Sequence, residues 1–289
     1  MRYLLGAILA SSFIFATISN YKALSGCFNY KNQEYKLLRA FRYNQKEYLL
    51  VANTTTLQTF KVAKFAYTLE PCHPSKYLSL LQEASSAPYP LHNDGIIANP
   101  KGVTLTTDLC PSSKKGFEQE LYERLFQSFP NPVPLTIFIT KRWITKHQKE
   151  FHQLKSWQEE KKLAITWGNH TAYHHYHPGL PDNQNFVLSP DENLVEDIFD
   201  LEKTLIENNT TPSVFFRFPG LVSNKKSMQI VSSLGLISIG ANSWLAKGEG
   251  LKKDSIILLH GNKNEPVGIK LFFKLLQEQK IQELTPLLW

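Results

Sequence analysis

The 289-residue chain contains only three cysteines, and no two of them form a CxxC pair. It therefore lacks the cysteine density of a disulfide scaffold and the paired cysteines of a zinc ribbon. It also lacks a P-loop, a GxGxxG turn and a GxSxG elbow, so nucleotide-dependent and serine-hydrolase mechanisms have no residues to perform them. No run of five like charges occurs, although 32 basic residues outnumber 25 acidic ones. We therefore expect no nucleic-acid partner.

The first 26 residues form a separate segment. Arg2 is followed by residues 3–18, which are mainly apolar or small and carry no charge. This pattern is typical of a secretory signal peptide. An uncleaved membrane anchor is the alternative, but this stretch is shorter than the ~20 residues of a full span. We therefore expect residues 1–26 to direct export to the periplasm or cell envelope.

Cys27 has two interpretations. Residues 24–27 read Leu-Ser-Gly-Cys, which matches the small-residue pattern before a lipidated cysteine in bacterial lipoproteins. Lipidation of Cys27 would attach the protein to a membrane, but Asn20 and Lys22 interrupt the apolar run that normally leads into such a site. In an oxidising compartment Cys27 could instead pair with Cys72. The sequence leaves both alternatives open.

The rest of the chain divides into two regions with different periodicity. Residues 27–90 alternate aromatic and polar side chains, as in 48–54 and 59–67, which predicts a small β-rich domain. Residues 91–99, within a stretch of prolines and polar residues, predict a linker. Over 100–289, apolar runs of strand length alternate with amphipathic helical stretches, which predicts a mostly parallel α/β domain, open or closed into a barrel. The expected strands are 103–109, 133–140, 163–167, 214–218, 237–241 and 255–260, and the expected helices are 116–129, 141–160, 193–208, 225–234 and 268–280.

Polar side chains follow the ends of these expected strands, where parallel α/β domains place their chemistry. Asp108, His170, Arg217 and His260 all occupy such positions, and four of the nine histidines lie between residues 170 and 177. His170 and His174 are four residues apart, so in a helical turn both imidazoles would reach one ion. Zn²⁺ accepts neutral imidazole and keeps a position for water when only three protein ligands are present.

Five short motifs resemble those of polysaccharide deacetylases of the NodB-homology type, carbohydrate esterase family four. They occupy residues 105–111 (Leu-Thr-Thr-Asp-Leu-Cys-Pro), 168–174, 217–220 (Arg-Phe-Pro-Gly), 243–244 and 258–260. Each motif alone is weak, but their order and spacing over residues 100–289 are specific. The resemblance implies a deformed (β/α) barrel that removes N-acetyl, or occasionally O-acetyl, groups from a sugar polymer with the help of a divalent metal, Zn²⁺ first among them.

The resemblance also implies a role for each matching residue. Asp108 would be the general base, Arg217 would keep it oriented and ionised, and His260 would protonate the leaving amine. His170 and His174 would bind the metal. Trp244, Pro219 and Gly220 would form the substrate pocket, with Trp244 as an apolar wall for the acetyl methyl group. Gly220 stands where the family usually has Tyr, and its backbone N–H could help to stabilise the oxyanion.

One position departs from the family pattern. The family's first motif has two adjacent aspartates, the second of which binds the metal, and here that second position is Leu109. Three explanations are open: Asp108 turns toward the metal, His177 supplies the third ligand, or the site is metal-poor and inactive. Cys110 is a further candidate, as a soft ligand or as a small buried residue. We expect an active site based on the histidines, with Asp108 near the ion.

Two functions therefore compete. The first is a metal-dependent hydrolase acting on an N-acetylated envelope polysaccharide, with peptidoglycan as the leading substrate and other N-acetylhexosamine polymers behind it. The second is a catalytically impaired sugar-binding or scaffolding protein on the same fold, because of Leu109. Retention of Asp108, Arg217 and His260 favours the enzyme, since a binding protein needs neither an acid nor a base. Release of acetate would distinguish the two.

Overall fold

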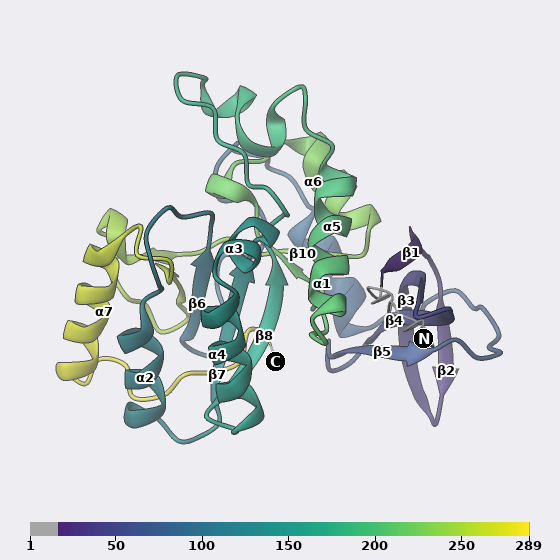
Figure 1. Ribbon diagram of the computed structural model, residues 1–289, viewed down its shortest axis with the longest axis horizontal. Coiled ribbons are helices and arrows are strands. Elements are labelled where there is room, and N and C mark those ends of the chain that lie inside the picture. Colours follow the sequence, from purple (N-terminus) through teal and green to yellow (C-terminus); the bar gives the residue numbers. More distant parts are fainter. Residues whose placement is uncertain (1–16, 289) are drawn as a thin grey trace, which may run out of the picture.

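The structure is a computed structural model that describes residues 17–288 (Figure 1). Residues 1–16, most of the expected export segment, and residue 289 lie outside the described residues. The described chain forms two sheets, one antiparallel and N-terminal, the other parallel and C-terminal. None of the helices in residues 17–288 has the length and apolar character needed to cross a membrane.

The C-terminal region is a curled parallel sheet of seven strands, which confirms the expected α/β class with a deformed barrel. Its spatial order is β10-β9-β8-β7-β6-β12-β11, and each neighbouring pair is parallel. The strands are β6 (Thr104–Leu109), β7 (Val133–Ile139), β8 (Leu163–Asn169), β9 (Phe215–Phe216), β10 (Ile237–Ser238), β11 (Ser243–Trp244) and β12 (Ile256–His260). The carboxyl ends of all seven strands therefore meet at one edge of the sheet.

Amphipathic helices cover this sheet, and most coincide with the expected ones. They are α2 (Gln119–Ser128), α3 (Lys141–Lys146), α4 (Gln148–Glu159), α5 (Leu194–Glu207), α6 (Lys225–Ser233) and α7 (Pro266–Gln277). The single helix expected over 141–160 is interrupted at His147, whose backbone dihedrals are not helical. The helix α1 (Lys76–Ala84) was not expected; it follows the first sheet and is capped by Ser75, whose hydroxyl accepts from the Leu78 N–H.

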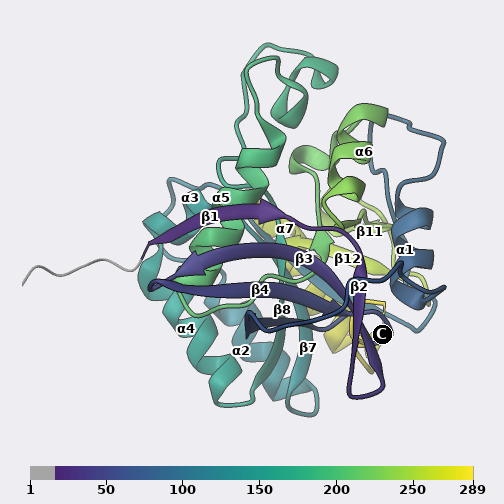
Figure 2. The ribbon, with the colours of Figure 1, turned by 90° about the vertical axis from the view of Figure 1, so that its right-hand side faces the viewer.

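The N-terminal sheet consists of β1 (Ile18–Ala23), β2 (Cys27–Tyr30), β3 (Gln33–Tyr43), β4 (Lys46–Asn53) and β5 (Thr59–Ala63). Figure 2 shows β1, β3 and β4 lying side by side across the parallel domain. Two-residue turns join β2 to β3 and β3 to β4, and all four turn residues have positive φ, as tight hairpins require. The export segment expected to end at residue 26 would thus include β1, an integral strand of this sheet.

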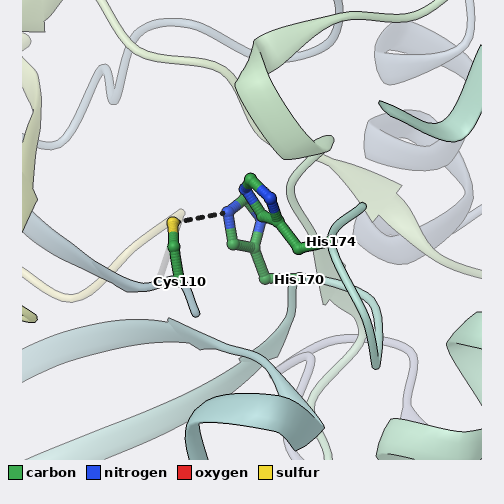
Figure 3. A group of neighbouring side chains, drawn as sticks. All are labelled: Cys110, His170 and His174. Atoms are coloured by element: carbon green, nitrogen blue, oxygen red, sulfur yellow. Dashed lines mark hydrogen bonds between the residues drawn. The ribbon is translucent and has the colours of Figure 1, made fainter. Parts of the chain in front are cut away.

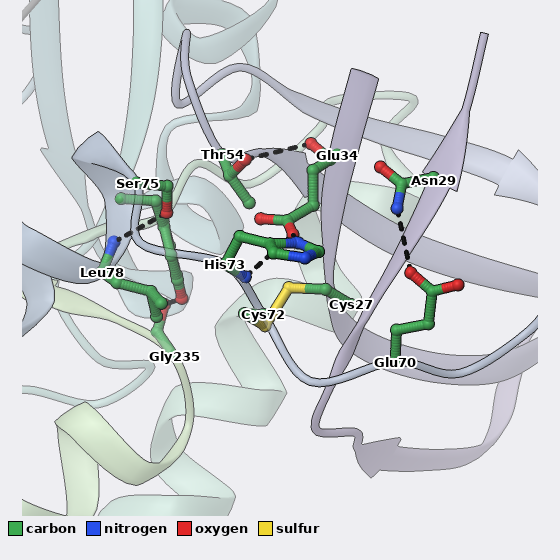
Figure 4. Close-up of a disulfide and its surroundings, with 11 residues drawn as sticks. Cys27, Asn29, Glu34, Thr54, Glu70, Cys72, His73, Ser75, Leu78 and Gly235 are labelled. Atoms are coloured by element: carbon green, nitrogen blue, oxygen red, sulfur yellow. Dashed lines mark hydrogen bonds and ion pairs between the residues drawn. A yellow bond between two sulfur atoms is a disulfide. The ribbon is translucent and has the colours of Figure 1, made fainter. Parts of the chain in front are cut away.

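Of the two alternatives for Cys27, the structure contains the disulfide. The sulfurs of Cys27 and Cys72 are bonded to each other across a 45-residue separation (Figure 4). A sulfur in a disulfide cannot also carry the thioether of a lipid anchor. The bond closes the segment that runs from β2 to the start of α1, and it leaves Cys110 as the free thiol of the chain.

The two sheets share a hydrophobic core. Leu38 and Phe41 of the N-terminal sheet belong to the same buried cluster as Val214 and Ile237 of the parallel domain. The helix α1 adds the fully buried Tyr77, whose hydroxyl donates to the Gly235 carbonyl. The segment expected as a linker, 91–99, also pairs with the parallel domain through isolated bridges from Ile96 and Ala98.

Candidate active site

Asp108 and Arg217 form a buried ion pair at the carboxyl edge of the parallel sheet. Asp108 lies in β6, and Arg217 directly follows β9. Arg217 Nη1 donates to Asp108 Oδ1 at 2.7 Å and to Thr106 Oγ1 at 2.8 Å. Both side chains are almost wholly shielded from solvent. The sheet therefore brings together two charges that are 109 residues apart in the sequence.

The remaining donors of Arg217 are also satisfied. Nη2 donates to the Gly240 carbonyl at 2.9 Å and Nε to the Ile239 carbonyl at 3.3 Å, while the guanidinium lies over the Phe138 ring. Burial lowers the pKa of Arg217 from its ordinary value, and the negative charge of Asp108 opposes that shift. A guanidinium fixed in this way is a positioning group, because it holds the Asp108 carboxylate in one orientation.

His170 and His174 lie in an irregular loop after β8, and not in the helical turn expected from their spacing. Thr171 and His174 have positive φ, and the side chain of Asn169 holds the loop by accepting from the Thr171 N–H and donating to the Ile198 carbonyl. The two imidazole rings nevertheless meet, with centroids 4.9 Å apart.

The structure adds Cys110 to this histidine pair (Figure 3). Cys110 Sγ lies 3.5 Å from His170 Nε2, and one ligand atom from each of Cys110, His170 and His174 lies within 4.8 Å of the other two. Two imidazoles and a thiol suit Zn²⁺ and other borderline or soft ions, so the donors present fit a divalent metal.

The charges of this group depend on one another. Burial by itself would raise the pKa of Cys110, but His174, His170 and His260 together hold it well below its usual range. Burial would likewise lower the pKa of His170 and of His260, but the Cys110 thiolate raises both, with Asp108 also contributing to the rise at His170 and Glu265 at His260. The Cys110 thiolate and the protonated forms of His170 and His260 therefore stabilise one another.

His177, expected as a third ligand, lies apart from this group. Its residue is exposed, and its backbone N–H donates to Asn185 Oδ1. Its ring is 6.4 Å from that of His175, which pairs with Glu192. The loop leaves the site after His174, so the spacing of three residues does not return His177 to the same face.

Leu109 also points away from the site. Its side chain is fully buried in the core beneath α2, in one cluster with Leu121 and Tyr122. Because successive residues of a strand face opposite sides, Asp108 and Cys110 face the cavity and Leu109 faces the core. The second-aspartate position of the first motif is therefore a core position in this chain.

His260 ends β12, beside its register partner Asp108 in the neighbouring strand β6. Its Nδ1 is 2.8 Å from Glu265 Oε2, and the same oxygen accepts from Trp244 Nε1 at 2.8 Å. Glu265 immediately precedes α7 and was not identified as a site residue from the sequence. Its sequence signal is weak, because it is simply an acidic residue five positions after a histidine at a strand end. It fixes the orientation of both His260 and Trp244.

Asp108, the Cys-His-His group, His260, Glu265 and Trp244 line one cavity of about 540 Å³. Gly220 lines it with a φ of 64°, and an added Cβ there would lie 2.6 Å from the Phe186 ring. Phe186 thus occupies the space next to the position where the family usually has Tyr. Pro219 is buried at the start of the same turn, outside the cavity lining. The cavity is lined by Asp108, Cys110, Pro111, Arg142, His170, His174, Tyr176, Phe186, Gly220, Leu221, Trp244, Lys247, Leu258, His260, Asn264 and Glu265.

Comparison with known families gives one match. Residues 96–239 match the model of a family described as polysaccharide deacetylase. The matched residues include Asp108, His170, His174 and Arg217 and end before Trp244 and His260.

Several solved structures are similar to this chain at low identity. A family 4 carbohydrate esterase from Bacillus anthracis is 17% identical, with 74% of this chain and 90% of that chain covered and a TM-score of 0.49. A chitin deacetylase from the fungal pathogen Colletotrichum lindemuthianum is 18% identical over 68% of this chain and 89% of that one, with a TM-score of 0.48. A CE4 family pseudoenzyme from Bacillus anthracis is 15% identical over 65% and 66%, with a TM-score of 0.43.

Proposed function

The chain belongs to the polysaccharide deacetylase family, and we propose that it is a metal-dependent deacetylase of an envelope polysaccharide. Members of this family are hydrolases of amide or ester bonds. Peptidoglycan is the leading substrate, followed by other N-acetylhexosamine polymers. The observation that supports the proposal best is the arrangement around one cavity of a buried Asp108–Arg217 pair, a Cys-His-His group and a His260–Glu265 pair.

Asp108 acts as the general base. Its Oδ1 is engaged by Arg217, and its Oδ2 lies 3.8 Å from His170 Nε2, on the side of the candidate ligands. Arg217 holds the carboxylate in one orientation, and a carboxylate placed in this way can accept a proton from water. A divalent ion, when bound beside His170 and His174, polarises a carbonyl and lowers the pKa of water.

His260 acts as the general acid for the leaving amine. Glu265 accepts at Nδ1, which leaves Nε2 directed to the opposite side of the ring, where it can give a proton. The indole of Trp244 lies 6.0 Å from the His260 ring, centroid to centroid, and offers an apolar wall for the acetyl methyl group. Base and acid thus line one cavity from the ends of two neighbouring strands.

We further propose that the protein is exported. The disulfide between Cys27 and Cys72 is the kind of bond that persists in oxidising compartments such as the periplasm. Because β1 pairs with β3 and the hydroxyl of Tyr21 donates to Glu202, the processed chain keeps β1 and is cleaved before Ile18, not at residue 26. Sequencing of the N-terminus of the exported protein checks this boundary.

Acetate release tests the activity. Purified protein is incubated with N-acetylglucosamine oligomers or peptidoglycan, before and after chelation and after Zn²⁺ is restored. We expect chelator-sensitive release, and we expect Asp108→Asn to lower kcat/KM by ~10²–10⁴, the usual contribution of general acid–base catalysis. Asp191→Asn is the matched control, because Asp191 is exposed. A zinc-loaded protein that binds these glycans and releases no acetate would instead be a sugar-binding protein.

A further inference from the structure

Cys110 is a buried free thiol that lines the cavity. It follows β6 two residues after Asp108, and both residues line the cavity, whereas Leu109 between them lies in the core. We propose that Cys110 Sγ is the third protein ligand of the metal, with His170 and His174. This inference rests on the proposed function, because it names the donor set of that site.

The tautomer of His170 supports this assignment. His170 Nδ1 lies 2.8 Å from the Arg217 carbonyl oxygen, which can only accept, so Nδ1 carries the proton. In the neutral imidazole the lone pair is then on Nε2, the atom that lies 3.5 Å from Cys110 Sγ. The backbone of Arg217 therefore directs a metal-binding lone pair toward the sulfur.

The other candidates for the third ligand are less suited. Asp108 has one oxygen held by Arg217, and the other is needed for the base. His177 is exposed and lies outside the group, and Leu109 has no donor atom. Cys110 is the residue whose donor atom lies with those of both histidines.

A thiolate ligand has a chemical consequence. Sulfur favours borderline and soft ions such as Zn²⁺, whereas Mg²⁺, Ca²⁺ and Mn²⁺ prefer oxygen donors. Cys110 binds as the thiolate and the histidines bind as neutral imidazoles, so the protons that these groups carry pass to solvent when the ion enters. We expect the site to select Zn²⁺ over Mn²⁺, and a Cys110→Asp variant to lose much of that preference because the donor becomes a hard oxygen.

Thiol protection tests the assignment without measuring activity. Since Cys27 and Cys72 are bonded to each other, alkylation by iodoacetamide reports on Cys110 alone. We expect Zn²⁺ to slow alkylation of the chelated protein about tenfold or more, because a coordinated thiolate is no longer free to attack. We expect Mn²⁺ to have little effect. His170→Ala should abolish the protection, and His177→Ala, the matched control, should keep it.

Zinc affinity of the full chain provides the second measurement. Cys110→Ser should weaken Zn²⁺ binding by about 100-fold or more, beyond the ~10–100-fold cost of losing an outer-shell partner. Any of three results would overturn the assignment. The first is an unchanged Zn²⁺ affinity in Cys110→Ser, and the second is equal alkylation with and without bound Zn²⁺. The third is an acetyl group on Cys110 during turnover that the chelator does not inhibit.

Failure of this inference and of the proposed function can be told apart. If acetate release is sensitive to the chelator but Zn²⁺ does not protect the thiol, Cys110 is not a ligand and the deacetylase function still stands. Zinc-dependent protection of the thiol in a protein that releases no acetate would support the ligand set and reject the activity.

Discussion

The buried ion pair between Arg39 and Glu202 provides the sharpest test of how the two sheets depend on each other. Arg39 in β3 and Glu202 in α5 make two parallel hydrogen bonds, 2.7 Å from Nε and 2.8 Å from Nη2. Their side chains are 0% and 1% exposed. Tyr21 in β1 donates to the same carboxylate, and Arg39 Nη1 donates to the Leu234 carbonyl. The pair therefore joins the N-terminal sheet to the parallel domain.

The perturbation is Glu202→Gln, which keeps the shape of the side chain and removes its charge. Arg39 would then be a buried cation without a counter-charge, because the guanidinium cannot lose its proton. Removing one partner of a buried pair costs ~3–5 kcal/mol. At ~2–4 °C per kcal/mol for a large domain, the expected fall in Tm is roughly 6–20 °C. An Arg39→Met, Glu202→Leu double variant should lose less than Glu202→Gln, because no charge is left unpaired.

Urea unfolding with the disulfide intact measures the effect. Four of the five tryptophans, Trp143, Trp157, Trp167 and Trp244, lie in the parallel domain, so tryptophan fluorescence reports mainly on that half, while far-ultraviolet circular dichroism reports on both sheets. We expect Glu202→Gln to shift both signals together. Glu47→Gln is the matched control, because Glu47 pairs with Lys64 on the solvent-exposed surface and such pairs contribute little. Equal shifts for the two variants, or movement of only one signal, would refute the reasoning.

Three further predictions concern single side chains. Leu109→Asp should destabilise the protein by at least ~3 kcal/mol, as an unpaired buried charge does, without tightening Zn²⁺ binding; calorimetric melting and zinc titration check both parts. Glu265→Gln should lower kcat roughly tenfold to a hundredfold, because His260 and Trp244 lose the charge that orients them. This is less than the ~10²–10⁴-fold contribution of an acid or a base. Steady-state kinetics measure the effect, and an unchanged kcat would exclude a positioning role for Glu265. Burial alone would raise the pKa of Glu34, but hydrogen bonds from His73 lower it in the folded protein. The ionised Glu34 carboxylate therefore stabilises the fold above its unfolded pKa of ~4.3, and this contribution is lost as the pH falls through its pKa in the folded protein. Glu34→Gln should therefore be less stable than wild type at neutral pH and approach it in acid; a difference that does not shrink in urea unfolding at low pH would contradict this assignment.

Much of the parallel domain was predictable because its signals are local. Apolar runs of strand length separated by amphipathic stretches specify buried parallel strands and their covering helices, whatever the distant contacts. For β7, 133–140 was expected and Val133–Ile139 observed. Short elements were harder to predict: β9 and β10 have two residues each, and α1 was missed within the region expected to be β-rich.

The features of the site also divide into those that the sequence predicts and those that it does not. The positions of Asp108, His170, Arg217 and His260 after successive strands were enough to place them at one edge of one sheet, since parallel strands all end on the same side. The sequence also limited the state of Cys27 to lipidation or a disulfide with Cys72, and the tertiary structure contains the disulfide.

Side-chain direction and partners depended on tertiary structure. Whether Cys110 or His177 joins His170 and His174 depends on where β6 ends and on the positive φ angles of the loop after β8, and neither follows from residue spacing. Glu265 reaches His260 only because α7 begins beside the end of β12. The sequence by itself determined which residues reach the carboxyl edge of the sheet, because strand periodicity is local. Only the tertiary structure decided which of them face one another, because that depends on contacts between segments far apart in the chain.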